Sequence, residues 1–180
     1  DRFGNSNSAI QLDGVNDYVD LGNIIDVSTQ SGMSVSGWFY PMGTMSTVNR
    51  WVGITVGKKA DGEMGIRVGN ETGKQLQSLL SSGFNFSSGS SSNACTAALP
   101  FVFNNWYHVV GVFQNNSSLL YVNGVLQSSN CGSNLGGGLL SHILSSADFR
   151  IGKAYNTNSD QRYFKGKIDE ANIFNRAIDY

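Results

Sequence analysis

Apolar and polar residues alternate with a period of two through most of this chain, and that pattern is the strongest constraint on its fold. It is clear at residues 34–40 and 52–56, where successive side chains differ in polarity. No long window carries the 3.6-residue period of an amphipathic helix. Because successive side chains of a strand point to opposite faces, the pattern predicts half-buried β-strands throughout.

Turn-forming residues separate the predicted strands. Asn123-Gly124, between two apolar runs, favours a type I′ hairpin, and Asp61-Gly62 favours a second hairpin. The 22 glycines against two prolines suit many short turns, and neither a linker nor an internal repeat divides the chain. The sequence therefore predicts one all-β domain over residues 1–180, an antiparallel two-sheet β-sandwich of jelly-roll type. Since the chain begins without an initiator methionine, we expect it to be one part of a larger multidomain protein.

The charge balance excludes several kinds of partner. The formal net charge is −1, and 14% of the residues are charged, which removes the strongest reason to expect nucleic acid as a partner. No apolar run approaches the roughly 18 residues of a membrane-spanning helix, so we expect no membrane insertion. Low charge combined with abundant Asn, Ser and Gly is common in secreted modules, and we expect an extracellular or cell-surface location.

The only two cysteines are Cys95 and Cys131, and both lie in polar, turn-rich segments. In a secreted domain they would most simply form one disulfide, which would contribute roughly 3–4 kcal/mol through loop closure. The alternative is two buried thiols in a protein of a reducing compartment.

Three segments resemble the laminin-G-like, concanavalin-A-like jelly-roll superfamily. They read IQLDGVNDYV at 10–19, NWYHVVGV at 105–112 with LYVNG at 120–124, and FKGKIDEANIFNRA at 164–177. The resemblance spans nearly the whole chain and implies the same fold. Residues 75–103 form a longer connection than is usual in this superfamily. Site residues of the superfamily therefore cannot be assigned to this segment. Members include carbohydrate-binding modules, adhesion modules and glycoside hydrolases, and fold alone does not choose among these uses.

Oxygen-bearing side chains are closely spaced near the N-terminus. Ca²⁺ prefers about six to eight hard oxygen ligands, which such side chains and turn carbonyls supply. In an antiparallel jelly roll the first and last strands are often neighbours, and the resemblance implies a structural calcium between these segments. We therefore expect a structural calcium held by Asp13, Gly14, Asn16, Asp17 and Asp169. The alternative is that Asp13 and Asp17 only form Asx-turns.

Catalysis finds little support in the sequence. Asp169 and Glu170 are adjacent in a predicted strand, so their side chains should point to opposite faces unless a bulge intervenes. The Glu-x-Asp-x-x-Glu pattern of related jelly-roll glucanases is absent, as are a nucleophile elbow and a zinc-ligand spacing. We expect the protein not to be an enzyme.

Aromatic and polar side chains gather in one predicted loop, at residues 155–163. Tyrosine and tryptophan rings stack on the apolar faces of sugars, while amide and guanidinium groups bind hydroxyls. We expect a sugar site formed by Trp51, Tyr155, Asn156, Asn158, Arg162 and Tyr163. An ordinary solvated loop is the alternative.

These observations favour a non-catalytic, lectin-like carbohydrate-binding module with a structural calcium. Its expected partners are a polysaccharide or other glycan and further domains of the parent chain. The competing hypothesis is an adhesion or spacer module that contacts protein or has no ligand of its own.

Overall fold

The computed structural model describes residues 1–24, 32–42, 52–58, 62–68, 79–80, 83–85, 99–100, 102–114, 117–131, 148–154 and 162–179. These ranges contain fifteen β-strands and no helix, hence none that could cross a membrane. The strands are β1 (Ile10–Asp13), β2 (Val19–Gly22), β3 (Gly32–Pro41), β4 (Val52–Lys58), β5 (Gly62–Val68), β6 (Leu79–Leu80), β7 (Gly83–Asn85), β8 (Leu99–Pro100), β9 (Tyr107–Gln114), β10 (Ser117–Val122), β11 (Val125–Cys131), β12 (Phe149–Ile151), β13 (Lys153–Ala154), β14 (Arg162–Tyr163) and β15 (Lys165–Phe174).

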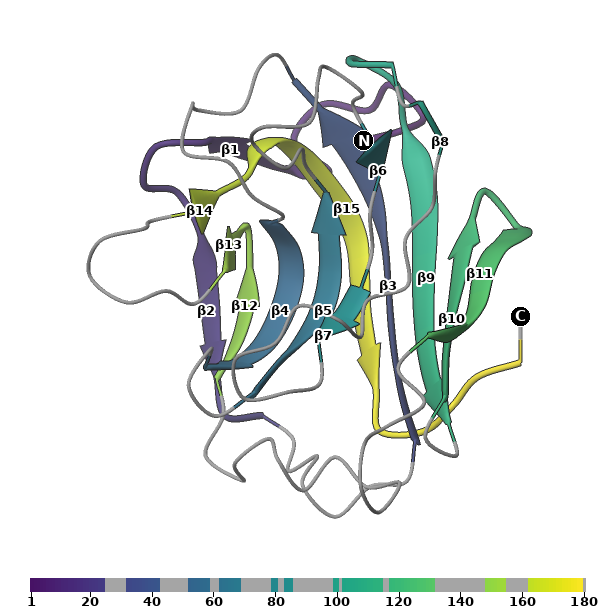
Figure 1. The fold of residues 1–180 in the computed structure, drawn as a ribbon. Helices are drawn as coiled ribbons and strands as arrows, with labels where there is room; N and C mark the ends of the chain where they lie inside the picture. The colour runs from purple at the N-terminus through teal and green to yellow at the C-terminus, as the bar shows by residue number, and fades with distance from the viewer. Residues whose placement is uncertain are drawn as a thin grey trace.

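Two antiparallel sheets pack face to face (Figure 1). One has six strands in the order β1-β15-β3-β9-β10-β11, and the other has five in the order β2-β12-β4-β5-β7. The pairs β13–β14 and β6–β8 form small two-stranded sheets. Many neighbours are far apart in sequence, as in a jelly roll. The predicted all-β sandwich is confirmed.

The last long strand, β15, lies between β1 and β3. On one side Ile10 pairs with Ile168 and Asp13 with Lys165, and on the other side Lys167 pairs with Tyr40. The prediction that the first and last strands are neighbours is therefore confirmed. The register also fixes which side chains of the two terminal segments can meet.

The hairpin between β10 and β11 turns at Asn123-Gly124, as predicted. Both residues have positive φ, 50° and 81°, which a type I′ turn requires. The Asn123 side chain also accepts a hydrogen bond from the backbone N–H of His108 at 2.9 Å, while the Asn123 N–H donates to the His108 carbonyl at 2.8 Å. The turn is thereby tied to the adjacent strand β9.

The core lies between the two sheets and is formed by alternate residues of their strands. In this core the rings of Phe39 and Phe164 meet edge to face, with centroids 6.1 Å apart and planes at 84°. Both are fully buried, so the contact joins β3 to the segment just before β15. Other buried apolar side chains are Leu12, Met33, Val35, Ile66, Val109, Phe113, Leu120, Phe149 and Ile168.

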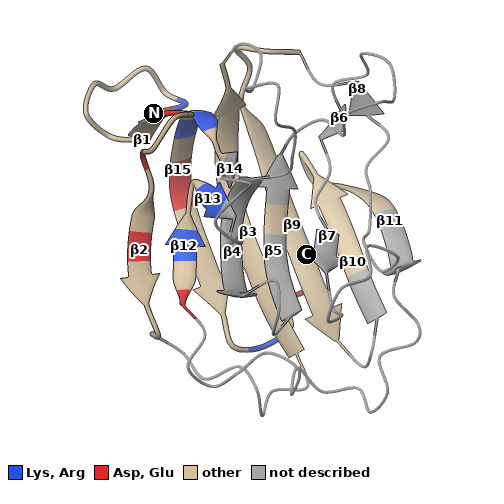
Figure 2. Cartoon of the chain, turned by 60° about the vertical axis from the view of Figure 1, so that its left-hand side comes forward, with Lys and Arg blue, Asp and Glu red and all other residues tan. Residues whose placement is uncertain are grey.

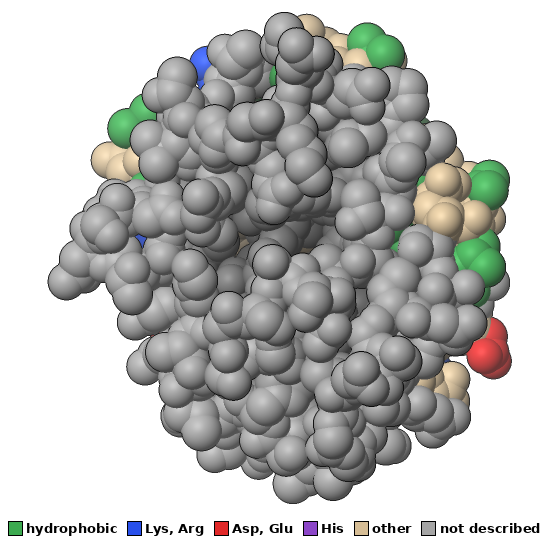
Figure 3. All heavy atoms as spheres, viewed as in Figure 1, with side chains coloured by type: hydrophobic (Ala, Val, Ile, Leu, Met, Phe, Trp, Pro, Cys, Tyr) green, Lys and Arg blue, Asp and Glu red, His purple; other side chains and the backbone are tan. Residues whose placement is uncertain are grey.

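The described surface is mixed in character. In the view of Figure 3, the hydrophobic side chains that reach the surface lie in separate groups at the margins of the molecule. In the view of Figure 2, charged residues of the described part lie on β2, β12 and β13, and on β15 of the other sheet. This charged side carries the residues considered below.

The Phe39–Phe164 contact gives a first prediction. Phe39→Leu and Phe164→Leu should each lower the free energy of unfolding by about 1–3 kcal/mol, because each leaves a cavity. The double variant should show a coupling of about 0.5–1.5 kcal/mol, the usual value of an edge-to-face pair. Urea unfolding of all four proteins measures this, with exposed Val102→Ala as the control, expected within about 0.5 kcal/mol of wild type. Strictly additive losses would contradict the contact.

Candidate functional site

The turn at residues 13–17 is held by the carboxylate of Asp13. Its Oδ1 atom accepts hydrogen bonds from the backbone N–H groups of Val15 at 2.7 Å, Asn16 at 3.2 Å and Asp17 at 3.4 Å. In return, Oδ2 of Asp17 accepts the N–H of Asp13 at 3.0 Å. These are the local hydrogen bonds of an Asx-turn, so the turn closes on its own side chains.

The charge of Asp13 is stabilised by this arrangement. The hydrogen bond from Val15 holds the pKa of the Asp13 carboxyl below its usual value, and those from Asn16 and Asp17 act in the same direction, against a smaller effect of desolvation. Gly14 occupies a left-handed conformation with φ of 79° beside β15. A Cβ atom at Gly14 would lie 2.6 Å from the Cβ of Lys165, so only glycine fits here without a shift.

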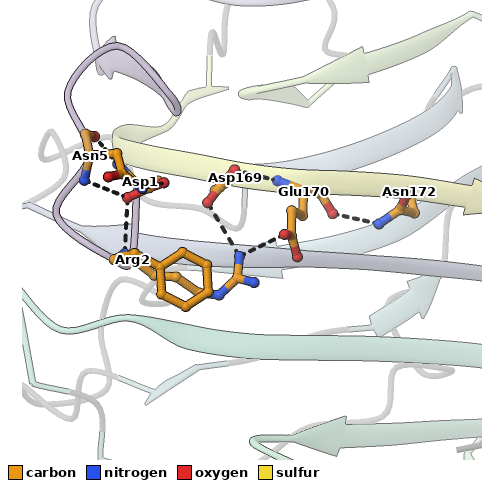
Figure 4. A network of polar contacts seen from close by, with 7 residues as sticks. Asp1, Arg2, Asn5, Asp169, Glu170 and Asn172 are labelled. Atoms are coloured by element: carbon orange, nitrogen blue, oxygen red, sulfur yellow. Dashed lines mark hydrogen bonds and ion pairs between the residues drawn. The ribbon is translucent and has the colours of Figure 1, made fainter.

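Asp169 lies away from this turn. Asp13 pairs with Lys165, and Asp169 lies four residues further along β15, roughly 13 Å for an extended strand. The Asp169 carboxylate contacts Arg2 instead, with Nη1 and Oδ2 3.4 Å apart, and its Oδ1 accepts the N–H of Glu170 at 2.9 Å (Figure 4).

Of the predicted calcium ligands, Asp169 lies apart from the turn that carries Asp13 and Asp17. One oxygen of Asp13 already accepts three backbone amides, and the register keeps Asp169 at a distance. Among the described residues, no group of three or more His, Cys, Asp or Glu side chains is placed to hold a metal ion. A calcium ion at the turn of residues 13–17 stays a prediction.

A bulge in β15 changes the expected directions of Asp169 and Glu170. The register of β15 against β3 shifts between Asp169 and Asn172, and Glu170 has φ of 46°. Both carboxylates consequently reach the same guanidinium, with Arg2 Nη1 3.0 Å from Oε1 of Glu170. The sequence predicted opposite directions for these two side chains unless a bulge intervened. The structure contains that bulge, and both carboxylates contact Arg2.

A cluster of two tyrosines and a lysine lies beside the turn. Lys153 Nζ is 4.2 Å from the ring centroid of Tyr18 and 5.2 Å from that of Tyr163. The two rings are 6.2 Å apart and inclined at 48°. Tyr18 is 41% exposed and Tyr163 is half-buried, so the cluster is accessible at the surface. We call Tyr18, Lys153 and Tyr163 the tyrosine–lysine cluster.

Gly152 positions this cluster. It follows β12 with φ of 85°, and this turn sends the chain into β13, where Lys153 pairs with Tyr163. A Cβ atom at Gly152 would overlap a terminal carbon of Leu12 and would lie 3.6 Å from the carbonyl oxygen of Asp17. The missing side chain thus lets the β13–β14 pair lie against the segment that carries Tyr18.

Charged side chains of β2 and β12 adjoin the cluster, as the acidic and basic bands of Figure 2 show. Arg150 contacts Asp20 at 3.3 Å and Asp148 at 2.8 Å. A hydrogen bond from the N–H of Gly22 is the main reason that the pKa of Asp20 lies below its usual value, and Arg150 and the nearby Lys153 add to the effect. The cluster therefore has hydrogen-bonding groups of both charges at its edge.

The predicted sugar-binding residues are only partly within the described ranges. Tyr163 belongs to the cluster, and Arg162 lies on β14 opposite Ala154, with its side chain outside the description. Trp51, Tyr155, Asn156 and Asn158 lie outside the described residues, and so does Cys95 of the predicted disulfide, while Cys131 ends β11.

Tyr18 and Lys153 were not among the predicted site residues. Tyr18 has a weak signal in the sequence, because it belongs to the Asn-Asp-Tyr end of the turn that the calcium prediction already singled out. Lys153 has none, since a lone lysine after a strand is usually solvated. What joins them to Tyr163 is the turn at Gly152, which only the structure shows.

A second aromatic group lies on the outer face of the six-stranded sheet. Trp38 and His108 are register partners on β3 and β9, and their rings stack with centroids 4.9 Å apart. Burial is the main reason that the pKa of His108 lies below its usual value; Arg2 lowers the pKa further, whereas Glu170 opposes the shift.

Sequence comparison identifies the family. A family model described as the concanavalin A-like lectin/glucanases superfamily matches residues 13–179. In a comparison with curated proteins, none matches this chain.

Solved structures with a similar fold are numerous. Domain 4 of AbnA, a GH43 extracellular arabinanase from Geobacillus stearothermophilus solved with arabinotriose, is 21% identical with a TM-score of 0.62, covering 95% of this chain and 72% of that one. The CBM40 of a Ruminococcus gnavus IT-sialidase, bound to α2,3-sialyllactose, is 12% identical with a TM-score of 0.67, covering 95% and 90%. A heptameric SAP-like pentraxin from Limulus polyphemus is 14% identical with a TM-score of 0.68, covering 95% and 77%. At these identities the likeness concerns the fold.

The close approach of Gly14 to Lys165 predicts that alanine is tolerated less well at Gly14 than at Gly22. Gly14→Ala should destabilise the protein more than Gly22→Ala, by about 1–2 kcal/mol. Both residues have positive φ, but a Cβ atom meets Lys165 at Gly14 and open space at Gly22. Urea unfolding of the two variants measures the difference. Equal losses would show that the contact of the turn with β15 adds nothing.

The environment of His108 predicts a pH dependence of stability. Because its pKa is lower in the folded than in the unfolded state, stability present at neutral pH should decline as the pH falls through about 6.5 toward the folded-state pKa. His108→Gln should remove this component. Urea unfolding at about pH 7.5 and 5.5 compares the two proteins; an unchanged loss of stability in the variant would contradict the assignment.

Proposed function

This chain belongs to the concanavalin A-like lectin/glucanase superfamily, and on that premise we propose that it is a non-catalytic carbohydrate-binding module of a secreted or cell-surface protein. Its ligand is a polysaccharide or other glycan, bound at the tyrosine–lysine cluster.

The tyrosine–lysine cluster is the observation that carries this proposal. Two tyrosine rings at the surface flank an ammonium group, and Tyr18 is substantially exposed. A pyranose or furanose ring can place its apolar C–H face against such a ring. The neighbouring Asp20 carboxylate, 42% exposed, offers an acceptor for hydroxyl groups, and sugar subsites usually combine aromatic rings with such polar groups.

The position of the cluster in the fold gives further support. The predicted sugar-binding segment of residues 155–163 ends at Tyr163, and Tyr163 pairs with Lys153 between β14 and β13. Two similar structures, the arabinanase domain and the sialidase module, were solved with bound oligosaccharides. Their ligands differ, so they support glycan binding as a class and no particular sugar.

A glycan array tests the proposal. Wild-type protein should bind at least one plant, algal, bacterial or animal glycan. Tyr18→Ala and Tyr163→Ala should each weaken that binding by about 1 kcal/mol, roughly fivefold, whereas the corresponding Phe variants, which keep the ring, should retain most of it. Val125→Ala, an exposed position on the β10–β11 hairpin, is the control for general effects.

Two results would count against the proposal in different ways. Binding that is indifferent to both tyrosines would leave the function standing and place the site elsewhere. If no glycan bound, the function would be wrong, and the adhesion or spacer hypothesis would take its place.

A further inference from the structure

Arg2 lies between two carboxylates of the last strand. Its Nη1 atom is 3.4 Å from Oδ2 of Asp169 and 3.0 Å from Oε1 of Glu170 (Figure 4). The Arg2 side chain is 17% exposed and that of Asp169 is 11% exposed, so this pair is shielded from solvent, while Glu170 is 53% exposed. Removing one partner of an ion pair that is largely shielded from water destabilises the folded protein, because the remaining charge is left uncompensated.

The bulge in β15 places the carboxylates of Asp169 and Glu170 on the same side of the strand, where both contact Arg2. Glu170 has a left-handed backbone, and its carbonyl accepts the Nδ2 group of Asn172 at 2.7 Å. The Asp169 side chain accepts the N–H of Glu170 at 2.9 Å. In a regular strand these two side chains would diverge, so without the bulge a single cation could not reach both.

Two aromatic rings complete the surroundings of the guanidinium. Its central carbon lies 4.2 Å from the ring centroid of Phe3 and 4.7 Å from that of Trp38. A planar guanidinium can bind carboxylates through its edge and rings through its faces at the same time. Ca²⁺ requires oxygen ligands around it and gains little from ring faces. This environment matches the chemistry of arginine.

The segment that carries Arg2 is folded on itself. The Asp1 side chain accepts hydrogen bonds from the N–H of Phe3 at 2.9 Å and of Asn5 at 2.8 Å, and its other oxygen accepts the Asn5 amide at 2.9 Å. The tight loop limits where the Arg2 side chain can reach. It therefore reduces the conformational entropy lost when Arg2 docks.

We propose that Arg2 is the built-in cation that fastens the N-terminal segment to β15, so that this junction needs no calcium. The positive charge between the first and last segments, which the family resemblance assigned to a metal ion, is supplied by the chain itself. Arg2 acts as a structural residue, and the inference does not depend on the glycan site.

Thermal unfolding of the chain tests this assignment. Wild-type protein should have the same melting temperature in EDTA and in millimolar Ca²⁺. Arg2→Gln should melt about 3–6 °C lower, since it leaves two carboxylates without their cation. Arg2→Lys keeps the charge but loses the planar fork, and it should fall between the two. Arg176→Gln is the matched control, because Arg176 is exposed and its guanidinium donates to the carbonyl of the neighbouring Ala177 at 3.3 Å.

A calcium titration of Arg2→Gln adds a second readout. With the guanidinium gone, Asp169 and Glu170 repel each other, so millimolar Ca²⁺ should raise the melting temperature of this variant while leaving wild type unchanged. Glu170→Gln should lower stability less in the Arg2→Gln background than in wild type, since the two residues act together. A wild-type melting temperature that falls in EDTA, or an Arg2→Gln variant as stable as Arg176→Gln, would overturn the inference.

Discussion

The pairing of β15 with β1 on one side and β3 on the other is the interaction on which the rest of this structure depends. It joins β15 to β1, more than 150 residues away, and to β3, at least 125 residues away, so its formation costs loop-closure entropy that local contacts cannot repay. Burial on the inner face offsets that cost, with Ile168 and the preceding Phe164 packed against β3. On the outer face the same strand carries the carboxylates that hold Arg2.

The candidate glycan site depends on this pairing indirectly. β15 brings Lys165 against Gly14 and thereby fixes the turn that leads to Tyr18. The segment immediately before β15 supplies Tyr163. Consequently, residues from the two ends of the chain meet at one edge of the sandwich, where Lys153 lies between them. The sheet provides the rigid support, and short turns present the side chains.

Much of the fold could be predicted from local patterns. A period of two specifies strands, and Asn123-Gly124 specifies its hairpin, because these preferences come from the residues themselves. The site was harder to predict because it depends on register and on backbone irregularities. Asp13 and Asp169 belong to neighbouring strands as expected, yet the register separates them. The bulge at Glu170 and the turn at Gly152 each redirect side chains, and no repeating pattern in the sequence reveals them.

The place of β15 also bears on how the chain comes to be folded during synthesis. A ribosome releases β1 and β3 early, but the strand that belongs between them emerges only when nearly the whole domain has been made. Until then, the facing edges of β1 and β3 are without their native partner. The strands of the six-stranded sheet therefore cannot pair one after another in the order in which they are synthesised. Its completion is a late event in which the final residues of the domain insert between strands made long before.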